Sequence, residues 1–123
     1  MLEALLAALN SHDLDAIAEL APSDERFRES HRRMLAAFPD VHVDAEWTVV
    51  DSSRGVAWGH ITGTHQGEWR GIAPTGRPID VRGIIALEVD VDGRVSDFWL
   101  VNDWLGIATQ LGATLTPPSS GLG

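Results

Sequence analysis

The chain has no cysteine among its 123 residues. This absence excludes disulfide bonds, thiolate metal sites and a cysteine nucleophile. Basic residues are also scarce, because 9 of them face 18 acidic residues and leave a net charge of −9. A field of that sign repels phosphate backbones and anionic membrane surfaces, so we expect neither nucleic acid nor a membrane as a partner.

Long apolar runs and a secretory leader are missing as well. The opening MLEALLAALN has no basic start and no cleavage site, and no apolar stretch approaches the roughly 18 residues of a spanning helix. We therefore predict a location in the cytoplasm. A chain of 123 residues can bury one core, which predicts a single domain over 1–114 and a flexible tail over 115–123.

The first third of the chain has the apolar periodicity of helices. Leucines at helical spacing mark the first of them: Leu2, Leu5, Leu6 and Leu9. Asp13 stands where an N-cap would begin a second helix over 14–20, and Ser23 where one would begin a third. The apolar stripe of the third helix contains one histidine and consists of Phe27, His31, Met34, Leu35 and Phe38.

After Pro39 the apolar period changes to two, which is typical of strands with one buried face. We predict strands over residues 41–49, 56–65, 79–89 and 94–102. The buried face of the first strand would consist of Val41, Val43, Ala45, Trp47 and Val49. Asp103 is then expected to cap a last helix. Helices followed by an antiparallel sheet predict an α+β fold, with the helices on one face of a curved sheet and a cavity between the layers.

Two segments carry a resemblance to a known family: GTHQGEWRGIAPTGRPIDVRG at 63–83 and DGRVSDFWLVNDWLGIATQLG at 92–112. They resemble the SnoaL-like polyketide cyclases of the NTF2-like, ketosteroid-isomerase-like superfamily. The resemblance implies a cone-shaped fold with a helical lid, usually dimeric. It also implies members that close a ring by an intramolecular aldol reaction without metal or cofactor. The same cone hosts isomerases, hydratases, hydrolases and binding proteins, so the resemblance alone does not fix an activity.

The resemblance further implies an aspartate on the last strand as acid and base, helped by a histidine on the strand before it. The position of the aspartate is Leu100 in this chain, and that of the histidine is Ile85 or Ala86. None of these side chains can move a proton. The mechanism of the cyclases therefore does not transfer residue by residue.

Other polar residues are candidates for the chemistry. If Leu100 faces inward, alternation places Asn102 on the same face, where its amide can hold a carbonyl or enolate oxygen. The alternative is that Asn102 only ties down the strand-to-helix turn.

Histidines offer the second kind of candidate. His31 is either a satisfied core residue or a proton shuttle, and His60 either faces the pocket or lies on an outer sheet face. His12 and His42 are expected at the surface. No HxH or HxxxH pair exists, so we predict no metal site.

The predicted function is a cofactor-independent cyclase or isomerase of a polyketide-like intermediate, working as a homodimer. His31 or His60 would move the proton and Asn102 would hold an oxygen. The expected apolar walls are Phe38, Trp47, Trp58, Ile85, Phe98 and Leu100. Two alternatives stay open: a non-catalytic binding or assembly module, and a hydratase or hydroxylase. An open cavity with polar candidates favours chemistry, whereas a cone filled by aromatic side chains favours a module.

Overall fold

The computed structural model describes residues 1–22 and 25–117. Its helices are α1 (Leu2–Ser11), α2 (Leu14–Leu20), α3 (Glu25–Ala37) and α4 (Trp104–Gln110). Its strands are β1 (His42–Val50), β2 (Arg54–Thr64), β3 (Pro78–Val89) and β4 (Val95–Asn102). The strands form one antiparallel sheet in the order β1-β2-β3-β4. The predicted α+β fold is confirmed.

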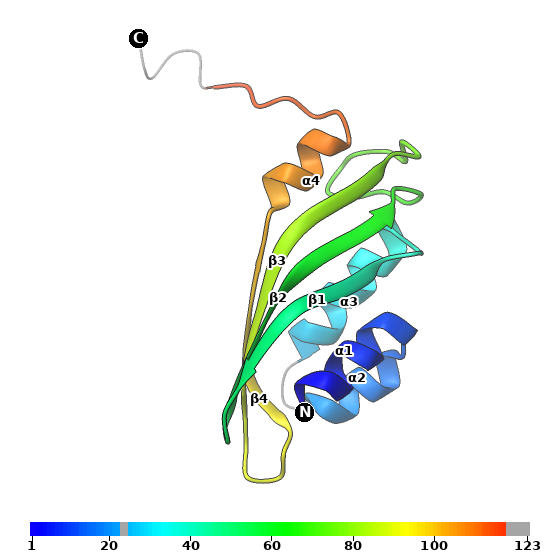
Figure 1. Cartoon of the computed structure of the whole chain (residues 1–123). Coiled ribbons are helices and arrows are strands. Elements are labelled where there is room, and N and C mark those ends of the chain that lie inside the picture. Colours follow the sequence, from blue (N-terminus) through cyan, green and yellow to red (C-terminus); the bar gives the residue numbers. More distant parts are fainter. Residues whose placement is uncertain (23–24, 118–123) are drawn as a thin grey trace.

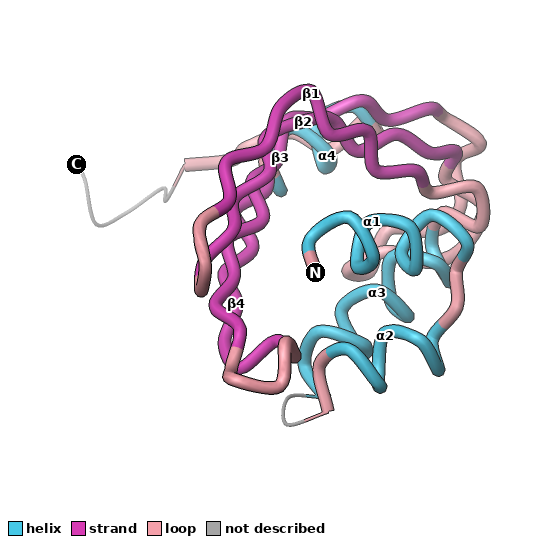
Figure 2. Tube along the Cα trace, turned by 60° about the horizontal axis from the view of Figure 1, so that its bottom comes forward, coloured by secondary structure: helices cyan, strands magenta, loops and turns pink. Residues whose placement is uncertain are grey.

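The sheet curves around the three N-terminal helices, which all lie on its inner side (Figures 1 and 2). Helix α4 follows β4 at the opposite end of the sheet from the β3–β4 hairpin (Figure 1). No helix of the described ranges is long and apolar enough to cross a bilayer.

Asn10 fastens the end of α1 to the start of β1. Its amide oxygen accepts the Val43 N–H at 2.8 Å, and its amide nitrogen donates to the Val43 carbonyl at 2.9 Å. The helix ends at His12, whose backbone is left-handed with φ 58°. This conformation is common after a helix but is usually taken by glycine or asparagine. The bend fixes α1 beside the inner face of the sheet and leads directly into α2.

Two predicted aspartate caps are present. The Asp13 side chain accepts the Ala16 N–H at 3.0 Å, and the Asp103 side chain accepts the Gly106 N–H at 2.7 Å. Both bonds satisfy a donor that the first helical turn leaves free. The predicted cap at Ser23 and residues 118–123 of the predicted tail lie outside the described residues.

The predicted alternation of β1 holds only as far as Ala45. Ala45 pairs with Gly59, but a bulge follows and Trp47 pairs with Trp58. One extra residue reverses which face the later side chains occupy. Trp47 is 51% exposed and Val49 63% exposed. The prediction that these two share the buried face is therefore wrong.

Two clusters of buried side chains fill the space between sheet and helices. The first lies under α1 and α2 and contains Leu2, Leu5, Ala8, Leu9, Ile17, Ala21, Phe27, Ala57, Leu87 and Val95. The second joins the end of α3 to α4 and contains Met34, Ala37, Phe38, Val41, Trp69, Ile79, Val81, Ile107 and Leu111. Between them the sheet has two facing glycines, the pair Gly59 and Gly83. Both glycines border a cavity, and their backbones allow close approach of the Asp44 carbonyl to Gly59 and of the Asn102 amide to Gly83.

Candidate functional site

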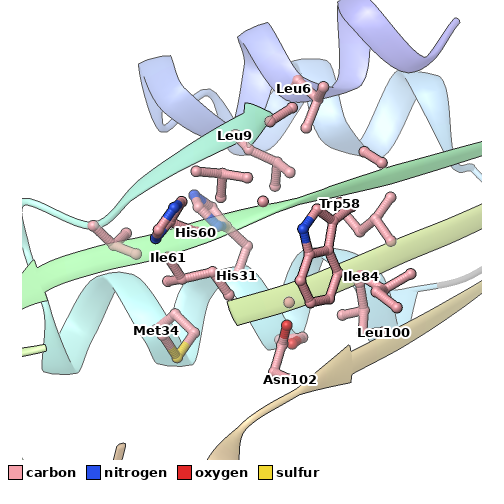
Figure 3. Close-up of a pocket in the computed structure, with 18 of the residues that line it drawn as sticks. Leu6, Leu9, His31, Met34, Trp58, His60, Ile61, Ile84, Leu100 and Asn102 are labelled. Carbon is pink, nitrogen blue, oxygen red and sulfur yellow. The ribbon is translucent and has the colours of Figure 1, made fainter. Parts of the chain in front are cut away.

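A cavity lies between the inner face of the sheet and helices α1 and α3 (Figure 3). Its apolar lining includes Leu6, Leu9, Met34, Val43, Ile61 and Leu100. Polar side chains reach it from two sides, with Ser30 and His31 on α3 and Asn102 on β4. Its volume is about 80 Å³, whereas ligand pockets usually hold about 300–1,000 Å³. A ligand of several rings therefore requires lining side chains to move or must extend beyond this cavity.

His31 is the buried histidine of the cavity, with 7% of its surface exposed. Burial, and to a smaller extent the charge of nearby His12, lower the pKa of His31 to about 4. A hydrogen bond with the backbone of Leu9 acts in the opposite direction. The ring is consequently neutral at neutral pH and has a lone pair that can accept a proton.

His12 lies beside His31 rather than at an open surface. Its Nδ1 is 3.4 Å from Nε2 of His31, and the two rings stack with centroids 5.6 Å apart. The prediction of a surface residue is wrong for His12, because the left-handed end of α1 brings it against α3. The contact links His31, which borders the cavity, to the half-buried ring of His12, which a proton from solvent can reach.

Asn102 is the last residue of β4 and pairs with Gly83 of β3. Its amide oxygen occupies the space that a Cβ on residue 83 would need. Within the described part of the chain this amide has no hydrogen-bond partner. The turn after β4 is held instead by the Asp103 cap. The amide is therefore available to a ligand.

The two positions that the family resemblance marks for acid and base form one cross-strand pair. Leu100 pairs with Ile85, and both border the cavity. Ala86 pairs with Trp99 on the outer face, so Ile85 is the inward one of the two alternatives. The centre of the site is thus aliphatic at the two positions where the family resemblance implies an acid and a histidine, and its polar groups lie at the edges.

His60 belongs to a charged network on the outer face of the sheet. Its Nδ1 is 2.9 Å from the Asp80 carboxylate, and its Nε2 contacts Glu46. The hydrogen bond to Asp80 raises the pKa of His60, and the bond to Glu46 adds to the effect. Glu46 also binds Arg82, which lowers the pKa of Glu46. Both ring nitrogens are engaged by these carboxylates. His60 is nevertheless one of the residues that border the cavity (Figure 3).

The expected apolar walls divide into two groups. Ile85, Leu100 and Trp58 border the cavity; the Trp58 ring itself lies near the Arg82 guanidinium, 5.8 Å from it. The other three lie elsewhere: Phe38 in the second core cluster, Trp47 on the outer face, and Phe98 against Phe27 with ring centroids 4.6 Å apart. Aromatic side chains do not fill the cone.

A second cavity of about 790 Å³ adjoins the first and shares Ser30, Met34 and Trp104 with it. It lies along α3 and the turn around Arg70. Five of the nine basic residues of the chain line it: Arg26, Arg28, Arg32, Arg33 and Arg70. We call it the arginine groove. The clustering of arginine in ERFRESHRR is visible in the sequence, but its meeting with residue 70 is not.

Within residues 1–22 and 25–117, no three histidine or acidic side chains are placed to hold a metal ion.

A curved antiparallel sheet closed by N-terminal helices, with a ligand cavity inside the cone, defines an NTF2-like protein. The model of the SnoaL-like polyketide cyclase family matches residues 1–111, and the chain belongs to that family. No curated protein matches its sequence.

Solved structures agree with this placement. AclR from Streptomyces galilaeus, a proposed hydroxylase, is 26% identical with a TM-score of 0.83, over 98% of this chain and 84% of AclR. IdmH from Streptomyces antibioticus, a proposed polyketide cyclase, is 25% identical with a TM-score of 0.76, over 91% of this chain and 96% of IdmH. TsrD from Streptomyces laurentii is 27% identical with a TM-score of 0.79, over 92% of each chain.

Proposed function

We propose that the protein is a cofactor-independent cyclase or isomerase of a polyketide-like molecule, with His31 as the base and Asn102 as the oxygen-binding group. One observation carries the proposal: a buried neutral imidazole and an amide without a hydrogen-bond partner among the described residues border the same apolar cavity. His60 is the weaker of the two histidine candidates, because its ring is engaged by Asp80 and Glu46.

The proposed reaction begins with a proton transfer. His31 takes a proton from a carbon next to a carbonyl, and the electron pair of that C–H bond moves onto the carbonyl oxygen. The amide N–H of Asn102 donates a hydrogen bond to this enolate oxygen. A pKa of about 4 makes the empty-site imidazole a weak base. The enolate that forms beside it favours the protonated ring and raises that pKa during the transfer.

Ring closure follows when the enolate carbon attacks a second carbonyl of the same molecule. The new alkoxide takes the proton back from His31, so that no proton is gained or lost overall. His12 offers a second route, because its Nδ1 lies 3.4 Å from Nε2 of His31. Apolar walls that hold a flexible chain in a folded geometry remove much of the entropic barrier.

A homodimer is part of this proposal. The outer face of the sheet exposes Trp47, Val49, Trp99 and Val101 to between 49% and 63%. An exposed apolar patch of that kind is typical of an interface. The cytoplasmic location and the domain limit at residue 114 stay predictions.

A hydroxylase is the second candidate. The observation that favours it is the Leu100–Ile85 pair, which removes the family acid and base, together with the likeness to AclR. Incorporation of an oxygen atom into the product, detected by mass spectrometry, would distinguish it from an isomerisation that leaves the mass unchanged.

The proton transfer can be tested without knowing the substrate. Ethyl benzoylacetate has an acidic methylene whose exchange in deuterium oxide is visible by NMR. We expect the protein to accelerate this exchange above the buffer rate, and His31→Gln and Asn102→Leu each to reduce the acceleration by about 100-fold. His60→Gln is the matched histidine control and should keep the wild-type rate. Full activity in both cavity variants, or a wild-type rate no faster than buffer, would contradict the proposal.

A further inference from the structure

We infer that the substrate carries an anionic group, a carboxylate or a phosphate, and that Arg70 binds it where the arginine groove meets the cavity. This inference rests on the proposed function, because it concerns the molecule that occupies the cavity. Three features of Arg70 support it: its backbone conformation, its aromatic contacts and its lack of an acidic partner among residues 1–22 and 25–117.

Arg70 occupies a backbone position that does not favour arginine. Trp69 and Ile72 exchange two backbone hydrogen bonds of 3.0 and 2.8 Å around it. Arg70 has φ 48° and Gly71 has φ 86°, as in a type I′ turn. Such turns select glycine, asparagine or aspartate at their first central position, because a Cβ is crowded there. The turn itself does not require arginine at this position, so the presence of a guanidinium here needs another explanation.

The guanidinium lines the groove and lies against Trp69 and Trp104. Its central carbon lies 5.1 Å from the Trp69 ring centroid and 4.8 Å from that of Trp104. Trp104 borders both the cavity and the groove. Cation–π contacts engage the flat faces of a guanidinium and leave the N–H groups along its edge available. These donors can therefore bind an anion at the mouth of the cavity.

Three of the other groove arginines already form ion pairs, two of them with the same glutamate. Their partners are glutamates of the same helix: Arg28 with Glu25 at 3.5 Å, Arg32 with Glu29 at 3.0 Å and Arg33 with Glu29 at 3.7 Å. Among the described residues no carboxylate forms an ion pair with Arg70. The nearby Glu68 carboxylate accepts the Gly71 N–H instead. In a chain of net charge −9, this guanidinium is an unneutralised positive charge beside the site.

The sizes of the two cavities agree with separate roles for them, the reaction in the first cavity and the binding of the charged group in the arginine groove. The reacting carbons would enter the apolar cavity of about 80 Å³, while the charged remainder of the substrate lies in the groove of about 790 Å³. A planar guanidinium binds carboxylates and phosphates through two parallel hydrogen bonds. Such a bond would fix which end of the molecule reaches His31 and Asn102.

Three naphthalene probes test the inference: 2-naphthoate, 2-naphthyl phosphate and the uncharged methyl 2-naphthoate. Binding is followed by NMR shifts of the His31 ring and the Trp104 indole, which border the cavity. We expect wild-type protein to bind at least one anionic probe about tenfold more tightly than the ester in low-salt buffer. The preferred anion identifies the source of the negative charge. Added salt should reduce the preference.

Arg70→Gly is the decisive variant, because glycine suits the turn and the protein should unfold at the wild-type denaturant concentration or above it. We expect this variant to bind charged and uncharged probes within about twofold of each other. Arg94→Gln removes an equal charge from the β3–β4 hairpin and should keep the preference.

Equal binding of all three probes to wild-type protein would overturn this inference and leave the proposed function intact. A preference that survives in Arg70→Gly would also overturn it. If no probe shifts the His31 and Trp104 signals, both the inference and the proposed ligand cavity are wrong.

Discussion

Nε2 of His31 lies 3.4 Å from Nδ1 of His12, and the planes of the two rings are 21° apart. The contact joins α3 to the residue that ends α1. At this distance both rings cannot readily be positively charged, because one ring is buried and the charges repel. Burial first and the His12 contact second keep the His31 ring neutral in the folded protein, so the stability of the protein depends on pH.

Stability should fall on mild acidification because of His31. Its pKa of about 4 in the folded chain lies below the ordinary histidine value of 6.5, so the unfolded chain binds the proton more readily. The contribution is complete above the unfolded value and is lost as the pH falls from 6.5 toward 4. Between about pH 7 and pH 5 the loss from this group is about 2 kcal/mol. Urea unfolding of wild-type and His31→Gln protein at both pH values measures it. An equal pH dependence in the two proteins would contradict the assignment.

Removing the His12 ring should raise the pKa of His31. Repulsion from His12 is one cause of the low value, second to burial. Asparagine is the appropriate replacement, because it tolerates the left-handed backbone that His12 adopts with φ 58°. NMR titration of the His31 ring in His12→Asn should give a pKa above that of the wild type. An unchanged or lower value would show that the two rings are not electrostatically coupled.

Gly83 should prove necessary for the position of Asn102. A Cβ on residue 83 would overlap the Asn102 amide oxygen, which is the end of a side chain and can move. We expect Gly83→Ala to cost about 1 kcal/mol of stability and to reduce the proton exchange rate about tenfold or more. Gly59→Ala is the contrast, because its Cβ would meet the Asp44 backbone carbonyl. That variant should lose about 3 kcal/mol. Full exchange activity in folded Gly83→Ala would argue against Asn102.

Local chemistry explains which features the sequence could predict. An aspartate cap needs only its own side chain and the N–H three residues later, so Asp13 and Asp103 were predictable. The inward position of His31 follows from the 3.6-residue period of its helix. The family resemblance, confirmed over residues 1–111, also placed Leu100 correctly on the cavity wall.

Features that depend on distant partners were not predictable. The bulge after Ala45 is defined by how β1 aligns with β2, and nothing in VHVDAEWTV marks the extra residue. His12 meets His31 across 19 residues because of where α1 ends. Arg70 reaches Trp104 only once the turn at 69–72 and helix α4 are in place. Each case needs the tertiary arrangement, which strand and helix periods do not contain.

Asp103 should matter for stability rather than for proton transfer. Its carboxylate accepts the Gly106 N–H at 2.7 Å at the start of α4. Asp103→Ala should cost about 1 kcal/mol in urea unfolding, and Asp103→Ser should restore most of it because serine also caps helices. The serine variant should keep the wild-type exchange rate with ethyl benzoylacetate. A large loss of exchange in a stably folded Asp103→Ser protein would indicate that the carboxylate has a chemical role.

The proposed homodimer depends on the outer face of the sheet. Trp99 is 49% exposed and Val101 63% exposed there, and desolvating such side chains is the main driving force for association. Trp99→Asp would place a charge in the interface, whose burial without a partner is costly. We expect light scattering to show a dimer for the wild type and a monomer for Trp99→Asp. Val91→Asp is the matched control, because Val91 is fully exposed at the tip of the β3–β4 hairpin and should leave the dimer intact. A wild-type monomer, or a dimer that survives in Trp99→Asp, would show that this face is not the interface.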